Sequence, residues 1–353
     1  MSLKYHVSAV RVNQSRPIIS KSNSEYDFNY NPALFSLTNG EDGMLVRCQL
    51  NNPNGGALPS ALAFSKFKEP LTIQNLDSVE VTPIRAEDIV FEPINELDSY
   101  GCEDPRIVYD NWHNEYVMLY SAVQADPFIS KLALATSSDP TDPNKWVRHG
   151  TLYNTWSKSG AIIIDNKKPH YFMIWGDSSL AFTASDDLRT FKTLNKSWLQ
   201  TRSDKFDSVL VESGPPPIKL SDGNYLFVYN SAKHIEFNKI QYNVGYLILD
   251  GENPQNILQR SDVPILSPDM KWEKEGLVGN VVFVEGMKIL VNKLGNDKFF
   301  IVYGAGDANI GGALVTVQYS TSQRNCINFN IFKTMKDLLM KPGSRLNIWS
   351  ERP

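Results

Sequence analysis

The chain has 353 residues, of which 42% are hydrophobic and 21% are charged, and its formal net charge is −4. This is the composition of an ordinary globular protein, long enough for one large core or two domains. No block of Lys and Arg stands out, so we expect no nucleic acid and no membrane as a partner, because phosphate binding needs clustered positive charge. No apolar run approaches the roughly 18 residues of a membrane span either.

The N-terminal segment "MSLKYHVSAVRVNQSRP" lacks the apolar core of a signal peptide. Cys48, Cys102 and Cys326 are far apart and odd in number, and the five histidines are scattered. This pattern favours neither a disulfide framework nor a metal site. We therefore expect a reduced, cytoplasmic protein with no metal and no cofactor, although the mature form of an exported protein would have the same features.

Short β-branched and aromatic runs bounded by turn residues recur along the chain, and few windows have helical periodicity. Five similar runs begin at residues 43, 116, 171, 225 and 299, and each is followed by a second apolar run, beginning at 61, 132, 180, 244 and 311. Five copies of a strand–turn–strand unit predict an all-β fold with radial repetition, a five-bladed β-propeller over residues 1–320. A two-sheet β-sandwich is the alternative, since it also needs many short strands.

The pattern changes over residues 321–353, where "FKTMKDLLMKPG" predicts a short helix that ends at Pro342 and Gly343. We expect this C-terminal extension to pack on the propeller or on a neighbouring subunit. The second arrangement would make the protein a homo-oligomer.

The stretch "GCEDPRIVYD" places two adjacent carboxylates just before an apolar run. Alternation along an extended backbone predicts that Glu103 and Asp104 point to opposite sides, with Arg106 on the side of Asp104. Pro105 biases Asp104 away from the helical region, so one carboxylate is expected to face the central channel. An Asp-Pro turn with a surface ion pair is the simpler interpretation.

Two further carboxylates are candidates for chemistry. Glu212 precedes Ser-Gly-Pro-Pro-Pro, whose prolines hold a stiff loop that suits an immobile catalytic group, or else a rigid connector. Glu285 follows "NVVFV" and is expected at a strand end, whereas Glu273 is expected in a solvated charge cluster. Paired carboxylates from different segments are what glycosidic cleavage requires. Trp156, Trp175, Trp272 and Tyr303 are candidate faces for a sugar ring, although aromatic residues in a β protein more often form the core.

The sequence resembles glycoside hydrolase family 130 over nearly all of residues 15–320. The resemblance is carried by eight segments: "SRPII" (15–19), "YNPALF" (30–35), "MLVRCQ" (44–49), "GCEDPRI" (101–107), "SKSGAII" (157–163), "SGPPPI" (213–218), "VGNVVF" (278–283) and "YGAGDANIGGAL" (303–314). It implies a five-bladed β-propeller and an inverting enzyme that acts on β-mannosides, by phosphorolysis in some members and hydrolysis in others.

The resemblance also implies roles for particular residues. Asp104 would be the acid, passing its proton to the glycosidic oxygen through a hydroxyl of the bound mannose. The expected substrate-binding residues are Arg47, Arg106, Lys158, Asn280, Tyr303 and Asp307, with Glu212 or Glu285 as the catalytic base.

The chain departs from the phosphorylases of this family at three places. It has "IWGDSSL" where they tend to carry an arginine, Asn230 where they tend to carry a histidine, and Glu212 where they lack a carboxylate. Such replacements would repel a phosphate dianion. The first hypothesis is therefore a hydrolase of β-1,2-linked manno-oligosaccharides. A mannoside phosphorylase that releases mannose 1-phosphate is the second hypothesis, and a non-catalytic glycan-binding propeller is the third.

Overall fold

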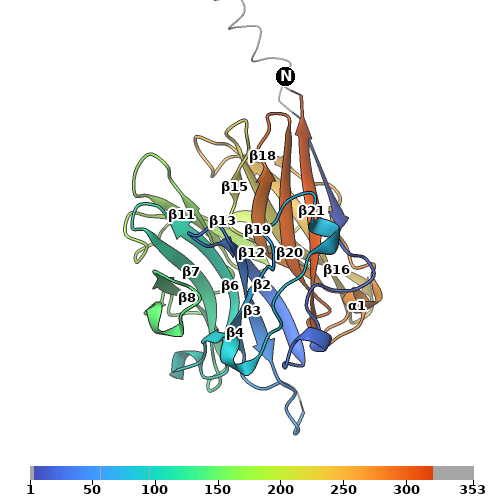
Figure 1. Cartoon of the computed structure of the whole chain (residues 1–353). Coiled ribbons are helices and arrows are strands. Elements are labelled where there is room, and N and C mark those ends of the chain that lie inside the picture. The colour runs from blue at the N-terminus through green and yellow to red at the C-terminus, as the bar shows by residue number, and fades with distance from the viewer. Residues whose placement is uncertain (1–3, 56, 95, 321–353) are drawn as a thin grey trace, which may run out of the picture.

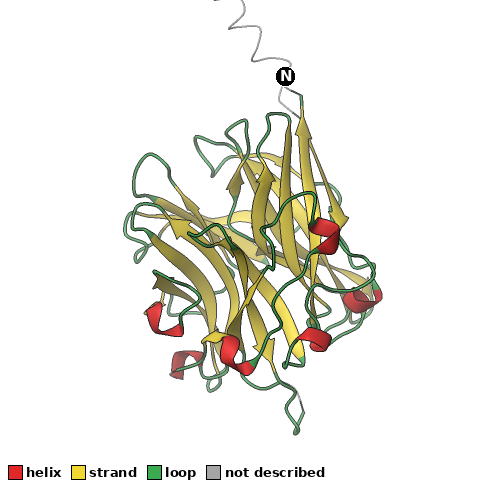
Figure 2. Ribbon diagram, in the orientation of Figure 1, coloured by secondary structure: helices red, strands yellow, loops and turns green. Residues whose placement is uncertain are grey.

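The structure is a computed structural model that describes residues 4–55, 57–94 and 96–320. It confirms the all-β prediction, because strands make up most of the described chain and the helices are short segments at the periphery (Figure 2). The strands form five separate antiparallel sheets, which are the blades of a β-propeller (Figure 1). The β-sandwich alternative is thereby excluded.

The strands of each blade are given in order from the innermost strand outward. Blade one contains β2 (Phe28–Ser36), β3 (Asp42–Gln49), β4 (Ala61–Lys66) and β5 (Ile89–Phe91). Blade two contains β6 (Gly101–Asp110), β7 (Glu115–Gln124), β8 (Ile129–Ser137) and β9 (Trp146–Thr151). Blade three contains β10 (Ala161–Ile164), β11 (Tyr171–Trp175), β12 (Ser179–Ser185) and β13 (Lys192–Gln200).

Blade four contains β14 (Leu210–Ser213), β16 (Tyr225–Glu236), β17 (Lys239–Leu249) and β18 (Ile257–Arg260), with β15 (Ile218–Lys219) also paired to β16. Blade five contains β19 (Val282–Val291), β20 (Asn296–Ala305) and β21 (Asn309–Tyr319), and β1 (Tyr5–Arg11) is its outermost strand. The helical segments are η1 (Lys21–Asn23), η2 (Leu76–Ser78), η3 (Ala86–Asp88), η4 (Glu96–Asp98), η5 (Pro143–Lys145) and α1 (Lys271–Lys274).

The repeated runs of the sequence fall on equivalent strands. The first set forms the second strands β3, β7, β11, β16 and β20, and the second set forms the third strands β4, β8, β12, β17 and β21. Their apolar side chains meet between neighbouring blades. Met44 and Val46 of β3, for example, lie in one buried cluster with Phe300 and Val302 of β20. The hydrophobic core is thus distributed around the ring, and the polar centre is left to the innermost strands.

The ring is closed by the N-terminal strand. β1 runs antiparallel to β21, from Tyr5 opposite Tyr319 to Arg11 opposite Ala313 (Figure 1). Tyr5 and Val7 are buried while the alternate residues face solvent, as expected for an outermost strand with one covered side. Blade five is therefore built from both ends of the described chain.

Three blades share a buried polar arrangement that we call the blade clamp. In each, an acidic residue ahead of the first strand binds an arginine of the fourth strand, and a tyrosine of the second strand bonds to that pair. The clamps are Asp98–Tyr120–Arg148 in blade two, Asp207–Tyr229–Arg260 in blade four and Glu273–Tyr303–Arg11 in blade five. The expectation that Glu273 lies in a solvated cluster is wrong, because its side chain is fully buried against Arg11.

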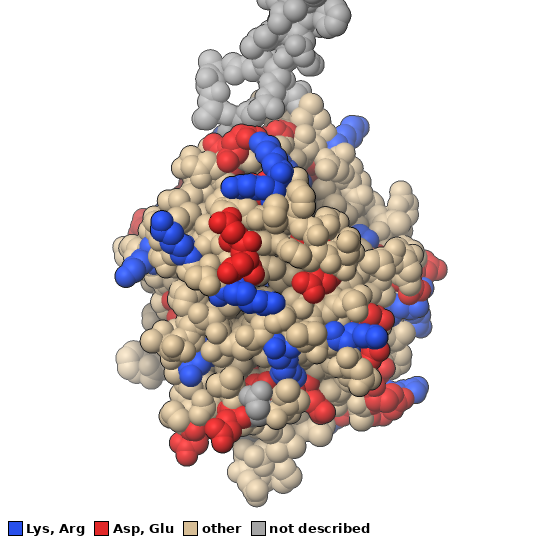
Figure 3. Space-filling model, turned by 90° about the vertical axis from the view of Figure 1, so that its left-hand side faces the viewer, with Lys and Arg blue, Asp and Glu red and all other residues tan. Residues whose placement is uncertain are grey.

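On the face shown in Figure 3, charged side chains of both signs are dispersed among uncharged ones. Within the described ranges, no helix has the length and apolar character needed to cross a membrane. The helix expected in residues 321–353, and the packing of that extension, lie outside the described residues.

Candidate active site

Of the ten non-glycine residues with left-handed backbone in the described part of the chain, five lie at one end of the innermost strands. They are Asn31 (φ 51°) in β2, Asp104 (φ 52°) in β6, Ser159 (φ 57°) before β10, Asn280 (φ 62°) before β19 and Asp307 (φ 47°) between β20 and β21. This conformation is uncommon outside glycine, is tolerated best by Asn and Asp, and is concentrated at functional sites in proteins. The backbone thus marks one mouth of the central channel as the candidate site.

A β-bulge at Asp104 directs both adjacent carboxylates to one partner. The pairing of β6 with β7 slips between Glu103 and Arg106, where Asp104 is left-handed. Arg47 of β3 consequently binds Glu103 at 2.6 Å and Asp104 at 3.0 Å. The prediction that these carboxylates point to opposite sides is wrong, because a bulge interrupts the alternation of an extended strand.

Arg106 is buried beneath the mouth and joins three blades. Its guanidinium donates to the backbone carbonyls of Asp104 and Ser213, at 2.9 and 2.8 Å, and forms an ion pair with Glu285 at 3.0 Å. Asn31 donates its amide to the same Glu285 oxygen at 2.9 Å. This cation therefore fixes the backbone on which the Asp104 carboxylate is carried.

Glu285 lies behind Arg106 and not in the open site. Its side chain is 0% exposed, and its second oxygen has no hydrogen-bond partner among the described residues. Burial raises the pKa of Glu285 to about 8, although the Arg106 guanidinium opposes the shift. A carboxyl group so enclosed is poorly placed to activate a water molecule, so it suits the support of Arg106 better than the role of a base.

Glu212 of β14 is held by the segment that enters blade three. Ser159 donates its hydroxyl to Glu212, and the Lys158 ammonium lies 3.0 Å from the same carboxylate oxygen. Lys158 also lies 4.0 Å from Asp177, in the turn between β11 and β12. Burial lowers the pKa of Lys158, but Glu212 and Asp104 outweigh it and raise the pKa above its usual value. Lys158 thus couples the carboxylates of blades two and four.

The two adjacent carboxyl groups of β6 differ in acidity. Burial alone would raise the pKa of Asp104, but Arg47, Arg106 and Lys158 outweigh burial and hold that pKa below its usual range. Burial raises the pKa of Glu103 in spite of Arg47. Burial also raises the pKa of Asp307 to about 7, with Asp104 and Glu103 adding to the shift and Arg47 opposing it.

Acidic groups outnumber cations in this cluster. The acidic groups are Glu103, Asp104, Asp177, Glu212, Glu285 and Asp307, and the cations are Arg47, Arg106 and Lys158. Arg47 and Lys158 are each already bound to a carboxylate. The Arg106 guanidinium is occupied by the Glu285 carboxyl group and two backbone carbonyls. The site as folded therefore holds no cation that waits for an external anion, among the residues that the structure describes.

The structure brings most of the predicted site residues together. The residues that assemble at the mouth are Arg47, Asp104, Lys158, Glu212 and Asp307, with Arg106 and Glu285 buried beneath them, and the roles of all seven stay predictions. Asn280 is half-buried in the segment before β19, and its carbonyl accepts a hydrogen bond from the backbone N–H of Tyr242.

The structure contradicts one of the site predictions, the one on Tyr303. Its side chain lies in the hydrophobic core of blade five, at 0% exposure, and its hydroxyl donates to Glu273. The prediction that Tyr303 binds the substrate is therefore wrong. The ring is stacked on Trp272 and lies over Gly311 of the neighbouring strand, so no face is left for a sugar.

Three residues of the site were not predicted: Tyr30, Asn31 and Ser159. The Arg47 guanidinium lies 4.5 Å from the centre of the Tyr30 ring, which limits where Arg47 can move. A signal for Asn31 was present, since Asn31-Pro32 and Asp104-Pro105 are both pre-proline residues in the first strand of a blade. Ser159 had no such signal, because its contact with Glu212 depends on the packing of blade three against blade four.

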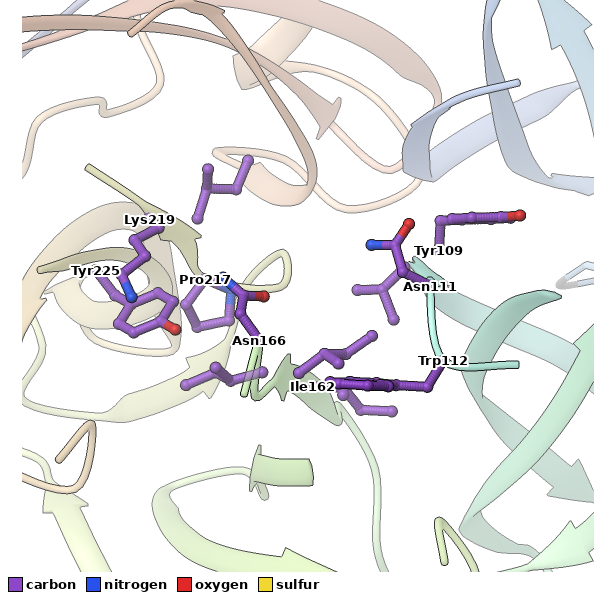
Figure 4. Close-up of a pocket in the computed structure, with 12 residues that line it drawn as sticks. Tyr109, Asn111, Trp112, Ile162, Asn166, Pro217, Lys219 and Tyr225 are labelled. Atoms are coloured by element: carbon purple, nitrogen blue, oxygen red, sulfur yellow. The ribbon is translucent and has the colours of Figure 1, made fainter. Parts of the chain in front are cut away.

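A cavity of about 440 Å³ is lined by the residues drawn in Figure 4. It lies away from this cluster, at the other end of the same strands. Asp104 is near the start of β6, whereas Tyr109 and Trp112 of the cavity lie at and just beyond the end of that strand. Its other walls come from β10, β15 and the start of β16. None of the assembled carboxylates lines this cavity, so its size alone does not identify it as the catalytic site.

Comparison with known proteins gives consistent matches. Residues 66–319 match the family model of glycoside hydrolase family 130, described as beta-1,4-mannooligosaccharide phosphorylase. A 1,2-beta-oligomannan phosphorylase of Thermoanaerobacter sp. (strain X514) is 31% identical over 268 residues, which is 74% of this chain and 81% of the relative. A beta-1,2-mannobiose phosphorylase of the same organism is 30% identical over 218 residues, 62% of this chain and 68% of the relative.

A solved structure has the same architecture. It comes from work described as showing that the GH130 family of mannoside phosphorylases contains glycoside hydrolases that target β-1,2 mannosidic linkages in Candida mannan. Its TM-score is 0.69 at 25% identity, and the match covers 89% of this chain and 94% of that one. The five-bladed ring is therefore shared over nearly the whole of both proteins.

Proposed function

Because the chain belongs to glycoside hydrolase family 130, we propose that it is an enzyme that cleaves β-1,2-linked mannosides with inversion at the anomeric carbon. The supporting observation is the Asp104 carboxylate, which is held at the mouth of the channel by Arg47 on the bulged start of β6. The names of the two relatives support the β-1,2 linkage, whereas the family model is described by a β-1,4 activity.

Asp104 would supply the proton for the leaving group. In the proposed reaction, the proton passes through a hydroxyl of the bound mannose to the glycosidic oxygen while the bond between that oxygen and the anomeric carbon breaks. The cations around Asp104 hold its pKa low, so the free enzyme carries this group ionised at neutral pH. Substrate binding must weaken the contact with Arg47 or provide the proton, which makes Arg47 part of the acid's control.

The acceptor of the mannosyl group is either phosphate or water, and similarity to known proteins favours phosphate. Both named relatives are phosphorylases, so the comparisons support phosphorolysis better than the hydrolysis that the sequence analysis put first. Arg47, Arg106 and Lys158 would then form the cage for the anion. Phosphate would have to displace Glu103 or Glu212 from these cations, since each cation is already paired.

The charge balance of the site favours water as the acceptor. A phosphate dianion would enter a cluster in which carboxyl groups outnumber cations even when Glu285 and Asp307, whose raised pKa values keep them largely or partly protonated at neutral pH, are left out of the count. The repulsion is strong at short range in a partly buried site.

Glu212 is the carboxylate better placed to receive the proton of an attacking water, because it is fixed by Ser159 and by Lys158, whose side chain is 24% exposed. The Glu212 side chain is itself only 2% exposed, but Glu285 is separated from the open site by the buried Arg106 guanidinium. In that reaction the water oxygen bonds to the anomeric carbon and free mannose is released.

One assay tests the proposal and separates the two acceptors. The protein is incubated with β-1,2-mannobiose with and without inorganic phosphate, and the products are separated by chromatography. The charge balance predicts free mannose at the same rate in both samples, whereas mannose 1-phosphate formed only with phosphate would establish phosphorolysis. Asp104→Asn should lower kcat by at least about 100-fold in either case, since it removes the acid. Full activity of Asp104→Asn would overturn the proposal.

A further inference from the structure

Two exposed aromatic side chains and a half-buried tyrosine form a cluster beside the candidate site. Phe128 is 62% exposed and Trp156 is 48% exposed. The ring of Phe128 lies 5.5 Å from that of Tyr100 and 6.4 Å from that of Trp156, measured between ring centres. We call Tyr100, Phe128 and Trp156 the rim cluster. Contiguous exposed apolar surface on a soluble protein often marks a binding site.

The rim cluster lies at the same end of the propeller as Asp104. Tyr100 immediately precedes β6, which carries Asp104 near its start. Phe128 is in the hairpin that joins β7 to β8, and the end of β7 pairs with the start of β6. Trp156 precedes Lys158 by two residues in the segment that leads into β10. All three rings therefore stand on loops around the catalytic mouth.

Trp156 is linked to the proposed catalytic groups by direct contacts. Its indole nitrogen donates to Asp177 Oδ2 at 3.3 Å. The same oxygen lies 4.0 Å from Lys158 Nζ, which in turn lies 3.0 Å from Glu212. Two contacts thus separate the indole from Lys158, a span that a disaccharide can bridge. The indole is also fixed in orientation by its bond to Asp177.

We propose that the rim cluster is a further sugar-binding subsite, which holds the leaving-group portion of a β-mannoside chain beyond the scissile bond. This inference rests on the proposed function. Aromatic rings provide flat apolar faces for the C–H face of a pyranose, and the indole N–H is a polar group at their edge. The occupant is assigned as substrate because the cluster is continuous with the catalytic mouth through Asp177 and Lys158.

The subsite predicts a preference for longer chains that depends on the rim cluster. We expect kcat/KM of the wild-type protein to rise from β-1,2-mannobiose to the triose and tetraose. Trp156→Ala and Phe128→Ala should each lower kcat/KM on the tetraose by about 3- to 10-fold, mainly through KM, and change the mannobiose value less. Phe128→Ala leaves the hydrogen bond from Trp156 to Asp177 intact. A lower kcat/KM in this variant therefore reflects lost stacking on the sugar and not a displaced Asp177.

Trp112→Ala is the matched control. Trp112 is 42% exposed and also donates its indole N–H, to the Asp165 carbonyl, but it lies at the opposite end of the propeller. This variant should keep the wild-type dependence on chain length. Equal losses on all chain lengths in the rim variants, or no chain-length preference in the wild type, would overturn the subsite.

Binding separates a failure of the subsite from a failure of the proposed function. Calorimetric titration of β-1,2-mannotriose into Asp104→Asn, with and without Trp156→Ala, tests the subsite even if the wild type cleaves no mannoside. A dissociation constant raised about 3- to 10-fold by Trp156→Ala supports the subsite, and an unchanged constant rejects the subsite alone. No binding to Asp104→Asn itself rejects the proposed function and the subsite with it. Concentration-dependent self-association that Phe128→Ala abolishes would instead assign the rim cluster to a contact between copies of the chain.

Discussion

Asp104 and Asn31 occupy equivalent places in neighbouring blades. Each precedes a proline, each has left-handed backbone, and each stands where the pairing of the first and second strands slips. Such backbone costs on the order of 1–3 kcal/mol and persists only where the surroundings fix it. Here Arg106 fixes both, because it binds the carbonyl of Asp104 and the carboxylate that receives the Asn31 amide.

The sequence could identify Asp104 but not its orientation. The E-D-P-R segment pointed to the residue through the family resemblance, and alternation then predicted the wrong side for its neighbour Glu103. The bulge that brings both carboxylates to Arg47 depends on blade-to-blade contacts of Arg106, which a local pattern does not contain. The prediction that Tyr303 binds the substrate was wrong for a related reason, since the sequence does not distinguish an aromatic residue near a site from one in the core.

Glu285 gives a prediction on the pH dependence of stability. Its pKa is about 8 in the folded protein against an ordinary value of 4.5, so the folded state holds this proton more tightly between those values. Stability from this group is therefore complete below about pH 4.5 and is lost as the pH rises through 8, with a slope of at most about 1.4 kcal/mol per pH unit. Glu285→Gln removes the titration, so its stability should fall less over this range.

Urea unfolding of the wild type and of Glu285→Gln at pH 5, 6, 7 and 8 measures this difference. The free energy of unfolding of the variant, relative to the wild type, should rise steadily with pH. Parallel curves for the two proteins would show that Glu285 does not hold its proton through neutral pH. The variant keeps a carbonyl oxygen that Arg106 and Asn31 can still bind, which preserves the local structure for the comparison.

At the scale of elements, the strands could be predicted from the sequence, but the blade clamps that hold them together could not. All ten runs picked from the sequence are second or third strands of blades, because apolar alternation between turn residues is a local signal. The blade clamps are not local. The Glu273–Tyr303–Arg11 clamp joins residues from opposite ends of the described chain, and the charge-rich sequence around Glu273 concealed a buried acid.

The clamps predict unequal effects of two similar substitutions. Arg11→Ala leaves the fully buried Glu273 carboxylate without a cation, which should lower the free energy of unfolding by about 3–5 kcal/mol. Arg260→Ala is the matched control, because Asp207 of that clamp keeps a second arginine, Arg202, at 2.8 Å. We expect Arg260→Ala to lower the free energy of unfolding by only about 1–2 kcal/mol. Urea unfolding of both variants measures the difference, and equal losses would show that the second arginine gives no compensation.

The whole ring depends on a contact between the start and the end of the described chain. β1 covers the outer edge of β21, and this pairing could not be predicted because its partners are separated by nearly the entire sequence. β1 also carries Arg11, so it supplies the cation of the blade-five clamp as well as backbone hydrogen bonds. An uncovered β21 would present unpaired N–H and carbonyl groups together with newly exposed apolar side chains, which is a template for association.

Removal of residues 1–11 tests this closure. We expect the shortened chain to melt at a lower temperature than the full chain and to elute as larger aggregates, because the edge of β21 is left unpaired and the Glu273 carboxylate is left without its cation. A synthetic peptide of residues 4–12, added in excess, should restore the elution and part of the melting temperature, since it can pair with β21 in the register from Tyr5 to Arg11. A scrambled peptide of the same composition should do neither. If the shortened chain elutes and melts as the full chain does, then blade five is stable with three strands and β1 is an addition to a ring already closed by the packing of neighbouring blades.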